Sequence, residues 1–299
     1  ARFTRTGGEA NAVAVRIARA HTGKDGIAVC GYHGWHDWYL SSNLSNKESL
    51  NNHLMSNLPI KGVPRNLKNS VFSFEYNDFK ALKKIVETKN VGIIKMEVER
   101  DEKPRDNFLK KVRDLASKKN IVLIFDECTS GFRSNLGGLH LKYKVYPDIA
   151  ILGKALGNGY AINAIIGRRE IMQASRETFI SSTFWTERIG PTAALETLKI
   201  MENTKSWNKI SAIGATIKSN WKKISRENSL KIDVKGLNAL PKFFFQSKNH
   251  NLYKTFITQE MLKNKILASN VVYTSVFHDR KMLQKYFDIL NKSFKKIHD

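Results

Sequence analysis

The sequence predicts an α/β protein with a mainly parallel sheet flanked by helices, followed by a smaller C-terminal α+β domain. The first observation is the run IVLIF at residues 121–125, because a strand buried on both faces of a parallel sheet is apolar throughout. The second is the alternation of such runs with segments of helical periodicity up to about residue 205. The third is a change of this pattern after Trp207. We therefore expect a large domain over residues 1–205 and a small one over 206–299.

The expected elements of the large domain follow from local patterns. Helices are expected where apolar residues recur every three or four positions, and strands where short apolar runs lie between turn residues. In chain order we expect a strand at the start, a helix over 6–20, a strand at 27–30, an extended loop over 41–70 and a helix after Asn77. A strand at 91–98, a helix over 106–119, strands at 121–125, 148–153 and 161–167, and a long helix over 189–203 complete the domain.

The expected small domain mixes helices with short strands. We expect helices over 208–227, 252–267 and 280–297, and strands at 232–234, 242–246 and 271–276. Because these strands do not alternate regularly with the helices, the pattern favours an α+β arrangement over a second parallel sheet.

The chain is strongly basic. Its 50 Lys and Arg residues against 27 Asp and Glu residues give a formal net charge of +23, which would suit a nucleic-acid partner. The lysines, however, are spread along the whole chain in patterns typical of solvated helix faces. No arginine-rich arm, zinc-ligand set or basic–aromatic RNA-binding motif accompanies them. We therefore expect a lysine-rich surface and no nucleic-acid partner.

The apolar runs and the cysteines indicate a cytoplasmic protein. No window approaches the ~18 consecutive apolar residues that a membrane span needs, and the N-terminus lacks the pattern of a secretory signal. We therefore expect no membrane partner. The two cysteines, Cys30 and Cys128, lie in apolar stretches and are too few for a disulfide framework, so we expect buried free thiols in a reducing cytoplasm.

Polar residues lie at the starts of helices and the ends of strands, where open α/β sheets bind their ligands. Gly7 and Gly8 begin the first helix, so their backbone amides can meet an anion with the help of the helix dipole, although a tight turn is the simpler alternative. Asp126 and Glu127 directly follow the apolar strand at 121–125. A carboxylate over the sheet edge would hold a cofactor's pyridinium nitrogen protonated. A helix-capping or loop acid is the alternative.

Lys154 differs from the other lysines in its position. It follows the apolar strand at 148–153 and is flanked by Gly153, Gly157 and Gly159. Burial at such a site would lower the pKa of the amine, as an amine needs in order to condense with an aldehyde. This position predicts a nucleophilic lysine.

A cluster of aromatic and histidine side chains follows the strand at 27–30. Such rings can stack on a planar ligand, and packing within a core is the ordinary alternative. The sequence does not decide between ligand stacking and core packing for these residues, which are Tyr32, His33, Trp35, His36, Trp38 and Tyr39.

Five motifs in this order resemble the class III aminotransferases, the fold-type I pyridoxal-phosphate group, and within it the branch similar to glutamate-1-semialdehyde 2,1-aminomutase. They are TGGEANAVAVRIARAHTG, GYHG, LIFDECTSGFR, PDIAILGKALGNG and SSTFWTERIGPTAALETL. They cover residues 2 to about 200, with weaker similarity beyond, and the ordered set is far more specific than any single motif. The resemblance implies a pyridoxal-phosphate transferase fold over 1–205, pyridoxal 5'-phosphate as cofactor, and an amino donor and a carbonyl acceptor as substrates.

The resemblance also implies roles for the residues around the cofactor ring. Lys154 would form the Schiff base with the cofactor and then move a proton between the substrate carbon and the cofactor carbon. Asp126 would pair with the pyridine nitrogen, and Tyr32 would stack on the ring. His33 lies in a matching segment and is expected among the cofactor-binding residues, and Glu97 lies in another without an assigned role.

Two further matches concern the cofactor phosphate. Gly7 and Gly8 would donate backbone N–H groups to it. Thr183 matches a threonine that reaches the phosphate bound by the neighbouring subunit, which implies a homodimer with shared sites. No residue of the motifs implies a metal.

The sequence departs from the aminomutase pattern at three places. Thr6-Gly7-Gly8 stands where a serine and a second hydroxyl residue usually surround the first glycine. Val98 follows Glu97 where proline is usual, and FWTERIGP follows Thr183 where Asn-Pro is usual. Two activities therefore stay open. One is amino-group exchange similar to that of glutamate-1-semialdehyde aminomutase, and the other is intermolecular transamination of a keto or aldehyde acid or a sugar.

The start of the chain adds a third alternative. Ala1 is followed by Arg-Phe-Thr, which is typical of a strand already in progress, and there is no initiator Met. Compared with the family, we expect an N-terminal segment that contributes substrate contacts to be missing. An inactive, incomplete cofactor-binding fragment is therefore the alternative to an enzyme.

Overall fold

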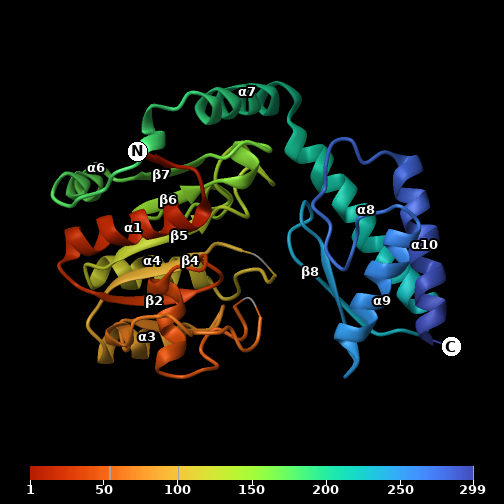
Figure 1. The fold of residues 1–299 in the computed structure, drawn as a ribbon, viewed down its shortest axis with the longest axis horizontal. Coiled ribbons are helices and arrows are strands. Elements are labelled where there is room, and N and C mark those ends of the chain that lie inside the picture. The colour runs from red at the N-terminus through yellow and green to blue at the C-terminus, as the bar shows by residue number, and fades with distance from the viewer. Residues whose placement is uncertain (54, 100, 299) are drawn as a thin grey trace. The chain divides into compact units, whose positions relative to one another are not determined.

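The computed structural model describes residues 1–53, 55–99 and 101–298 (Figure 1). Backbone contacts divide the chain into two compact units. Unit 1 consists of residues 1–98, 103–132 and 137–199, and unit 2 of residues 99–102, 133–136 and 200–299. Two short segments from the first half of the chain thus belong to unit 2, which the sequence pattern does not indicate.

Unit 1 contains a sheet of strand order β1-β7-β6-β5-β4-β2-β3. Strands β3, β2, β4, β5 and β6 are parallel, whereas β7 is antiparallel to β6 and β1 is antiparallel to β7. The prediction of a mainly parallel sheet is confirmed. Its strands are β1 (Arg2–Thr4), β2 (Gly26–Cys30), β3 (Val71–Ser73), β4 (Val91–Glu97), β5 (Val122–Glu127), β6 (Ile149–Leu152) and β7 (Asn163–Gly167).

Helices cover both faces of this sheet. Helix α1 (Gly7–Thr22) contacts β4 to β7, whereas α3 (Phe79–Thr88) and α4 (Phe108–Lys118) contact each other, β2 and β5 (Figure 1). Helix α1 begins after Thr6, whose side chain accepts the N–H of Glu9 at 3.2 Å, and it ends at Gly23 with a φ of 65°. The remaining helices of the unit are α2 (Asp37–Leu40), α5 (His140–Tyr143), α6 (Arg169–Met172) and α7 (Ile189–Thr204), of which α7 continues into unit 2.

The core between α1 and the sheet is apolar. Small residues on α1, Ala10, Ala14 and Ala18, let the helix lie close to the strands, and all three are fully buried. They pack against branched residues from the middle of the sheet, which are Ile27, Val29, Ile93, Ile124, Ile149, Ile151 and Ile165. Burial of these side chains is the main stabilising contribution to unit 1.

The structure differs from the predictions for unit 1 in three places. The segment 41–70 contains 3-10 turns at Ser41–Leu44 and Arg65–Leu67, with residue 54 outside the described residues. The edge strand β3 was not predicted, because three residues carry too little periodicity. Strand β5 extends to Glu127, so Asp126 and Glu127 are its last two residues at the carboxyl edge of the sheet, and both are buried there instead of open.

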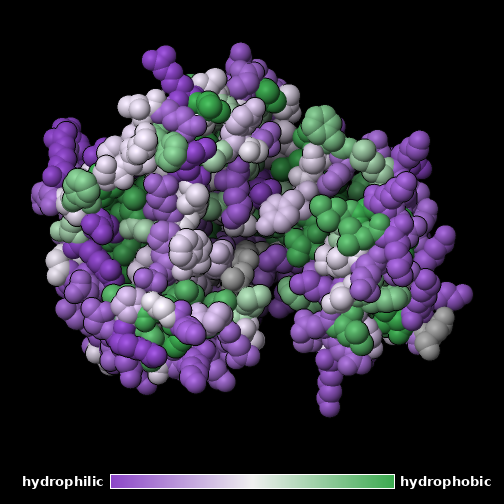
Figure 2. Space-filling view, in the orientation of Figure 1, coloured by the Kyte–Doolittle hydropathy of each residue, from purple (hydrophilic) through white to green (hydrophobic). Residues whose placement is uncertain are grey.

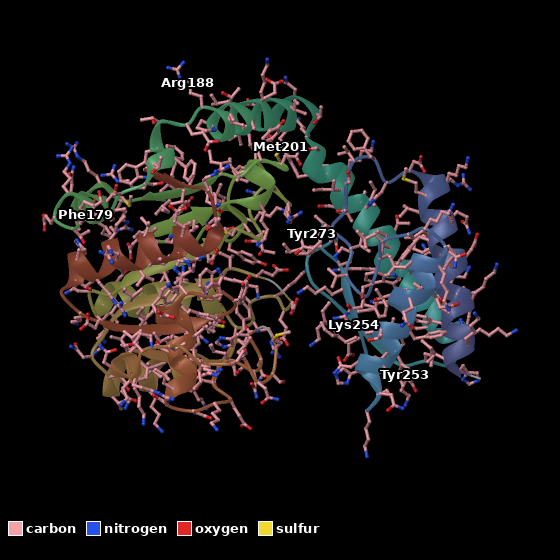
Figure 3. All side chains as sticks on the ribbon, viewed as in Figure 1. Phe179, Arg188, Met201, Tyr253, Lys254 and Tyr273 are labelled. Atoms are coloured by element: carbon pink, nitrogen blue, oxygen red, sulfur yellow. The ribbon has the colours of Figure 1, made fainter. Side chains whose placement is uncertain are left out.

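Unit 2 packs three helices around a small antiparallel hairpin. Helix α8 (Ser206–Glu227) leads to β8 (Ile232–Lys235) and β9 (Lys242–Phe245), which pair antiparallel, and α9 (His250–Lys263) and α10 (Arg280–His298) follow. Its core is rich in aromatic rings, including Trp221, Phe243 and Phe294. Tyr253 on α9, labelled in Figure 3, packs its ring 5.3 Å from that of Phe245.

The predicted strand at 271–276 is wrong. Val271 forms only an isolated bridge with Lys242. Val272 and Thr274 donate to the carbonyls of Pro241 and Ala239 with antiparallel spacing, but Pro241 has no N–H to return a hydrogen bond, so the ladder does not continue. The segment thus follows the backbone before β9 as an irregular chain.

The basic surface agrees with the prediction of solvated lysines. Hydrophilic residues cover most of the face shown in Figure 2. Lys83 and Lys223 are typical, with side chains 56% and 67% exposed and each within 4 Å of a glutamate one helical turn away. Other lysines on the helices are exposed as well: Lys80, Lys84, Lys110, Lys111, Lys118, Lys119, Lys222, Lys295 and Lys296.

Among the residues that the structure describes, every helix is too short or too polar to cross a membrane.

Candidate active site

The carboxyl ends of the parallel strands bring the predicted site residues to one edge of the sheet. In register, Asp126 on β5 lies beside Glu97 on β4 and Ile151 on β6. Lys154 follows the end of β6 by two residues. Since β7 is antiparallel to β6, its first residue, Asn163, lies at the same edge, where it pairs with Thr4 just before α1. The start of α1 therefore belongs to this edge too.

Asp126 is a buried, ionised carboxylate. Only 4% of the residue is exposed, and its Oδ1 accepts the N–H of Cys128 at 3.1 Å while its Oδ2 lies 2.9 Å from His33 Nδ1. Burial by itself would raise the pKa of Asp126, but the Lys95 ammonium and the hydrogen bonds from His33 and Cys128 hold that pKa well below its ordinary value. The site thus keeps a negative charge ready for a cationic group.

His33 is the buried partner of this carboxylate. Burial lowers the pKa of His33 to about 4, and the Lys95 charge acts in the same direction, while Asp126 opposes both. The imidazole is therefore neutral near pH 7. We assign its proton to Nδ1, because the carboxylate at 2.9 Å is a stronger acceptor than the carbonyl of Cys30, which lies 3.2 Å from Nε2. His33 then orients Asp126 without neutralising it.

Lys154 lies at this edge of the sheet, just after the end of β6. It begins the 3-10 turn Lys154–Leu156 with a φ of 44°, and its Nζ donates to Thr129 Oγ1 at 2.9 Å. The side chain is exposed, so the burial expected from the glycine-flanked position is wrong. Gly153 and Gly157 instead allow close packing, because a Cβ on them would lie 1.9 Å from Asn163 Oδ1 and 2.1 Å from the Tyr160 carbonyl oxygen. An accessible primary amine held in place by a hydroxyl suits condensation with an aldehyde.

The first turn of α1 presents backbone N–H groups that make no intrahelical hydrogen bond. Gly7 and Gly8 are its first residues, so their N–H groups precede the intrahelical hydrogen bonds, which begin with Ala10 donating to Thr6. A Cβ on Gly8 would lie 3.0 Å from His36 Nε2, and one on Gly34 would lie 3.1 Å from the Gly8 Cα. Glycine at both positions therefore allows the loop of residues 34–36 to pack closely against the first turn of α1.

Two residues that the sequence analysis did not single out, Asn163 and Thr129, tie these elements together. The Asn163 amide donates to the Arg5 carbonyl at 2.9 Å, and its Oδ1 lies 3.5 Å from Cys128 Sγ. A Cβ on Gly7 would be 3.5 Å from the same sulfur. Thr129 holds Lys154, as described above. A polar residue that opens an otherwise apolar strand, as Asn163 does in NAIIG, is the signal that would have indicated it.

Both cysteines are free and buried, as predicted. Burial raises the pKa of the Cys128 thiol well above its usual value, and nearby Asp126 adds to the shift. Burial likewise raises the pKa of Cys30, with Glu97 adding to it. Protonated buried thiols are poor nucleophiles, so the cysteines pack and do not react.

Tyr32 lies on the loop after β2, half-buried. Its N–H donates to Glu97 Oε2 at 3.1 Å, and its ring packs edge-on against Tyr39 with centroids 6.1 Å apart. The preceding Gly31 has a φ of 106°, and a Cβ there would lie 2.5 Å from Glu97 Oε2. Glu97 thus fixes this loop. Of the aromatic cluster, Trp38 and Tyr39 are core residues, whereas Trp35 is 73% exposed.

Glu127 has a structural part in the site. Its carboxylate accepts from Ser130 Oγ at 3.1 Å and from the backbone N–H groups of Leu139 and His140, and it contacts the His140 ring. These bonds close the loop that follows β5. The hydroxyl of Thr129 is positioned on that loop.

Thr183 lies apart from this group in the fold. It begins the 3-10 turn Thr183–Thr186 and is exposed. The neighbouring Phe184 ring lies under the Arg5 guanidinium at 4.2 Å, and Arg5 also approaches Glu187 at 3.7 Å. The turn is thereby attached to the strand-to-helix connection before α1.

Comparison with known proteins gives a consistent result. The family model described as aminotransferase class-III matches residues 1–275. The chain is 34% identical over 298 residues to 3-aminobutyryl-CoA aminotransferase from Cloacimonas acidaminovorans, which covers 96% of this chain and 67% of that protein. It is 30% identical over 329 residues to glutamate-1-semialdehyde 2,1-aminomutase from Wigglesworthia glossinidia brevipalpis, with 98% and 73% covered.

A solved structure described as a transaminase with PLP bound has the same fold. It superposes on 99% of this chain and 73% of its own with a TM-score of 0.86 at 21% sequence identity. The chain spans from about half to about three quarters of the length of the curated relatives it matches.

Proposed function

This chain belongs to the class III aminotransferase family, and we propose that it transfers an amino group from an amino donor to a carbonyl acceptor with pyridoxal phosphate bound at Lys154. The observation that supports this most directly is the meeting of three groups at one sheet edge. They are an accessible amine (Lys154), a buried ionised carboxylate (Asp126) and a helix N-terminus at Gly7 and Gly8.

The residues present fit each part of this cofactor. A phosphate suits the backbone N–H groups of Gly7 and Gly8 at the start of α1, which make no intrahelical hydrogen bond. A protonated ring nitrogen suits Asp126, because its pKa is depressed and the carboxylate is buried. An aldehyde suits the Lys154 amine. When bound, pyridoxal phosphate supplies this aldehyde and an electron-withdrawing ring.

In this proposal each residue has a defined task. Lys154 Nζ would hold the cofactor through its aldehyde and, when free, would carry a proton between two carbon atoms. Thr129 Oγ1 holds that nitrogen in place between these steps. Asp126 keeps the ring nitrogen protonated, His33 orients Asp126, and Tyr32 covers one face of the ring.

We further propose that the active protein is a homodimer. Thr183 is exposed on a turn fastened to the start of α1, a position suited to meeting the phosphate held by a second subunit. Thr183→Ala would then weaken cofactor binding about tenfold, the effect of one lost hydrogen bond to a charged group. The mass of the cofactor-bound protein by light scattering tests the dimer itself.

Two reactions are candidates. Similarity to 3-aminobutyryl-CoA aminotransferase favours intermolecular transamination, and similarity to glutamate-1-semialdehyde aminomutase favours intramolecular exchange. A single-substrate assay separates them, because an aminomutase converts glutamate-1-semialdehyde with no added amino donor. Conversion only in the presence of a donor would support the transaminase.

Absorption spectroscopy tests the central role of Lys154. Added pyridoxal phosphate should give a band near ~420 nm that borohydride abolishes. Lys154→Ala should lose this band and amino transfer, whereas Lys142→Ala, which removes an exposed lysine of the same unit, should keep both. A band that persists in Lys154→Ala would refute the assignment.

A further inference from the structure

Lys95 is a buried charge that the proposed mechanism does not use. It lies in the middle of β4, with Val29 and Ile124 as its neighbours on the adjacent strands, and it is completely inaccessible to solvent. Among the described residues its Nζ has no hydrogen-bond partner. Burying an ammonium without a partner costs several kcal/mol, so the position of this lysine needs an explanation other than stability.

The register of the sheet places Lys95 on the same face as Asp126. Side chains alternate along a strand, so Lys95 and Glu97 share one face of β4, and Ile124 and Asp126 share the same face of β5. This face carries the apolar contacts with α1. Lys95 precedes Glu97, the register partner of Asp126, by two residues. It therefore lies further from the carboxyl edge of the sheet than Asp126, between the apolar core and the site.

The charged groups around Lys95 come from three elements. Asp126 acts on it from the end of β5 and Glu97 from its own strand β4, and Lys95 in turn acts on His33, which lies on the loop after β2. Asp126 exerts the largest attraction of these, and burial outweighs it and lowers the pKa of the ammonium. The residues of α1 that face this part of the sheet, Ala10 and Ala14, are apolar.

We propose that Lys95 is a positioning residue that acts through Asp126 and weakens the hold of this carboxylate on a protonated ring nitrogen. The inference rests on the proposed function, because it requires a pyridine nitrogen at Asp126. The physical reason is that two cations, the Lys95 ammonium and the ring nitrogen, would share one carboxylate, and that Lys95 and Asp126 are both buried, where charges interact more strongly than in water. Lys95 thereby sets how strongly the bound ring withdraws electrons.

Binding of two cofactor forms isolates this effect. Pyridoxal phosphate carries the ring nitrogen, and its deaza analogue has a carbon atom in that place. The ratio of their Kd values therefore reports the contact with Asp126 alone. Lys95→Met keeps the length of the side chain and removes the charge, so pyridoxal phosphate should bind about tenfold more tightly relative to the analogue. The Kd of the analogue should stay unchanged.

Two further variants complete the test. Lys95→Gln should change the ratio in the same direction as Lys95→Met, and Lys89→Met, which removes one exposed charge close to the start of β4, should leave it unchanged. A ratio equal to that of the wild type in both Lys95 variants would overturn the inference. So would failure of both to fold, since Lys95 would then serve the core.

The same measurement separates this inference from the proposed function. If the wild-type protein binds neither pyridoxal phosphate nor the analogue, the proposed function fails. If it binds both with a ratio that does not depend on Lys95, only the role of Lys95 fails.

Discussion

The core of unit 2 and the strand ends of unit 1 bury side chains of opposite chemistry. In unit 2, the Phe243 ring meets Trp221 and Phe294 with centroids 4.8 and 5.8 Å apart. In unit 1, His33 and Asp126 are 1% and 4% exposed beside the fully buried Lys95. Aromatic burial stabilises the fold directly, whereas buried charges cost stability and persist where chemistry uses them. The second region is therefore the better indicator of function.

The largest effect is expected in the aromatic core. Trp221 is fully buried, and its removal would leave a cavity among Phe243, Tyr286 and Leu290. Trp221→Ala should lower the free energy of unfolding by about 4 kcal/mol. Denaturant unfolding followed by circular dichroism measures this change.

Trp35→Ala provides the matched control for this prediction. Trp35 is 73% exposed, so its removal should change the free energy of unfolding by less than about 1 kcal/mol. Equal losses in the two variants would contradict the view that unit 2 depends on its ring cluster.

Sequence patterns were sufficient for the regular elements. Alternation of apolar runs predicted β4, β5 and β6, and periodicity predicted α8 and α10 within one or two residues. Patterns failed where partners far along the chain decide the structure. Strand β3 exists because β2 offers it a parallel edge, and residues 271–276 form no strand because their neighbour Pro241 has no N–H to donate.

The site was predicted in part, for a similar reason. Lys154 and Asp126 were found because glycines and a strand end mark them in the sequence. Their surroundings depend on tertiary contacts, so the exposure of Lys154 and the burial of Asp126 were not foreseen. Lys95 carried a readable signal, a charge inside the apolar run VGIIKMEV, but its meaning requires the neighbouring strand.

The buried histidine predicts a pH dependence that distinguishes the two regions. The pKa of His33 is about 4 in the folded chain and about 6.5 in the unfolded chain. Between these values the unfolded chain binds more protons, so the free energy of unfolding should fall by about 3 kcal/mol as the pH drops from 6.5 to 4. Denaturant unfolding at several pH values measures this slope.

A substitution assigns this slope to His33. His33→Asn can still donate a hydrogen bond to Asp126 but does not titrate in this range, so the slope should become shallower. His21→Asn, at an exposed position of α1, should leave the slope as it is. An unchanged slope in His33→Asn would show that other groups cause the acid sensitivity.

The smallest effect concerns the one hydrogen bond that links Trp221 to Tyr286. Trp221 Nε1 donates to Tyr286 Oη at 2.9 Å inside the aromatic core, and burial raises the pKa of the Tyr286 hydroxyl, so it stays neutral. Tyr286→Phe would leave the indole N–H buried without an acceptor, which costs about 1–3 kcal/mol. Tyr253→Phe, on a half-buried ring packed against Phe245, should cost less than about 0.5 kcal/mol. If both variants unfold at the same denaturant concentration as the wild type, ring packing alone holds unit 2, and the contrast with the polar core of unit 1 becomes sharper.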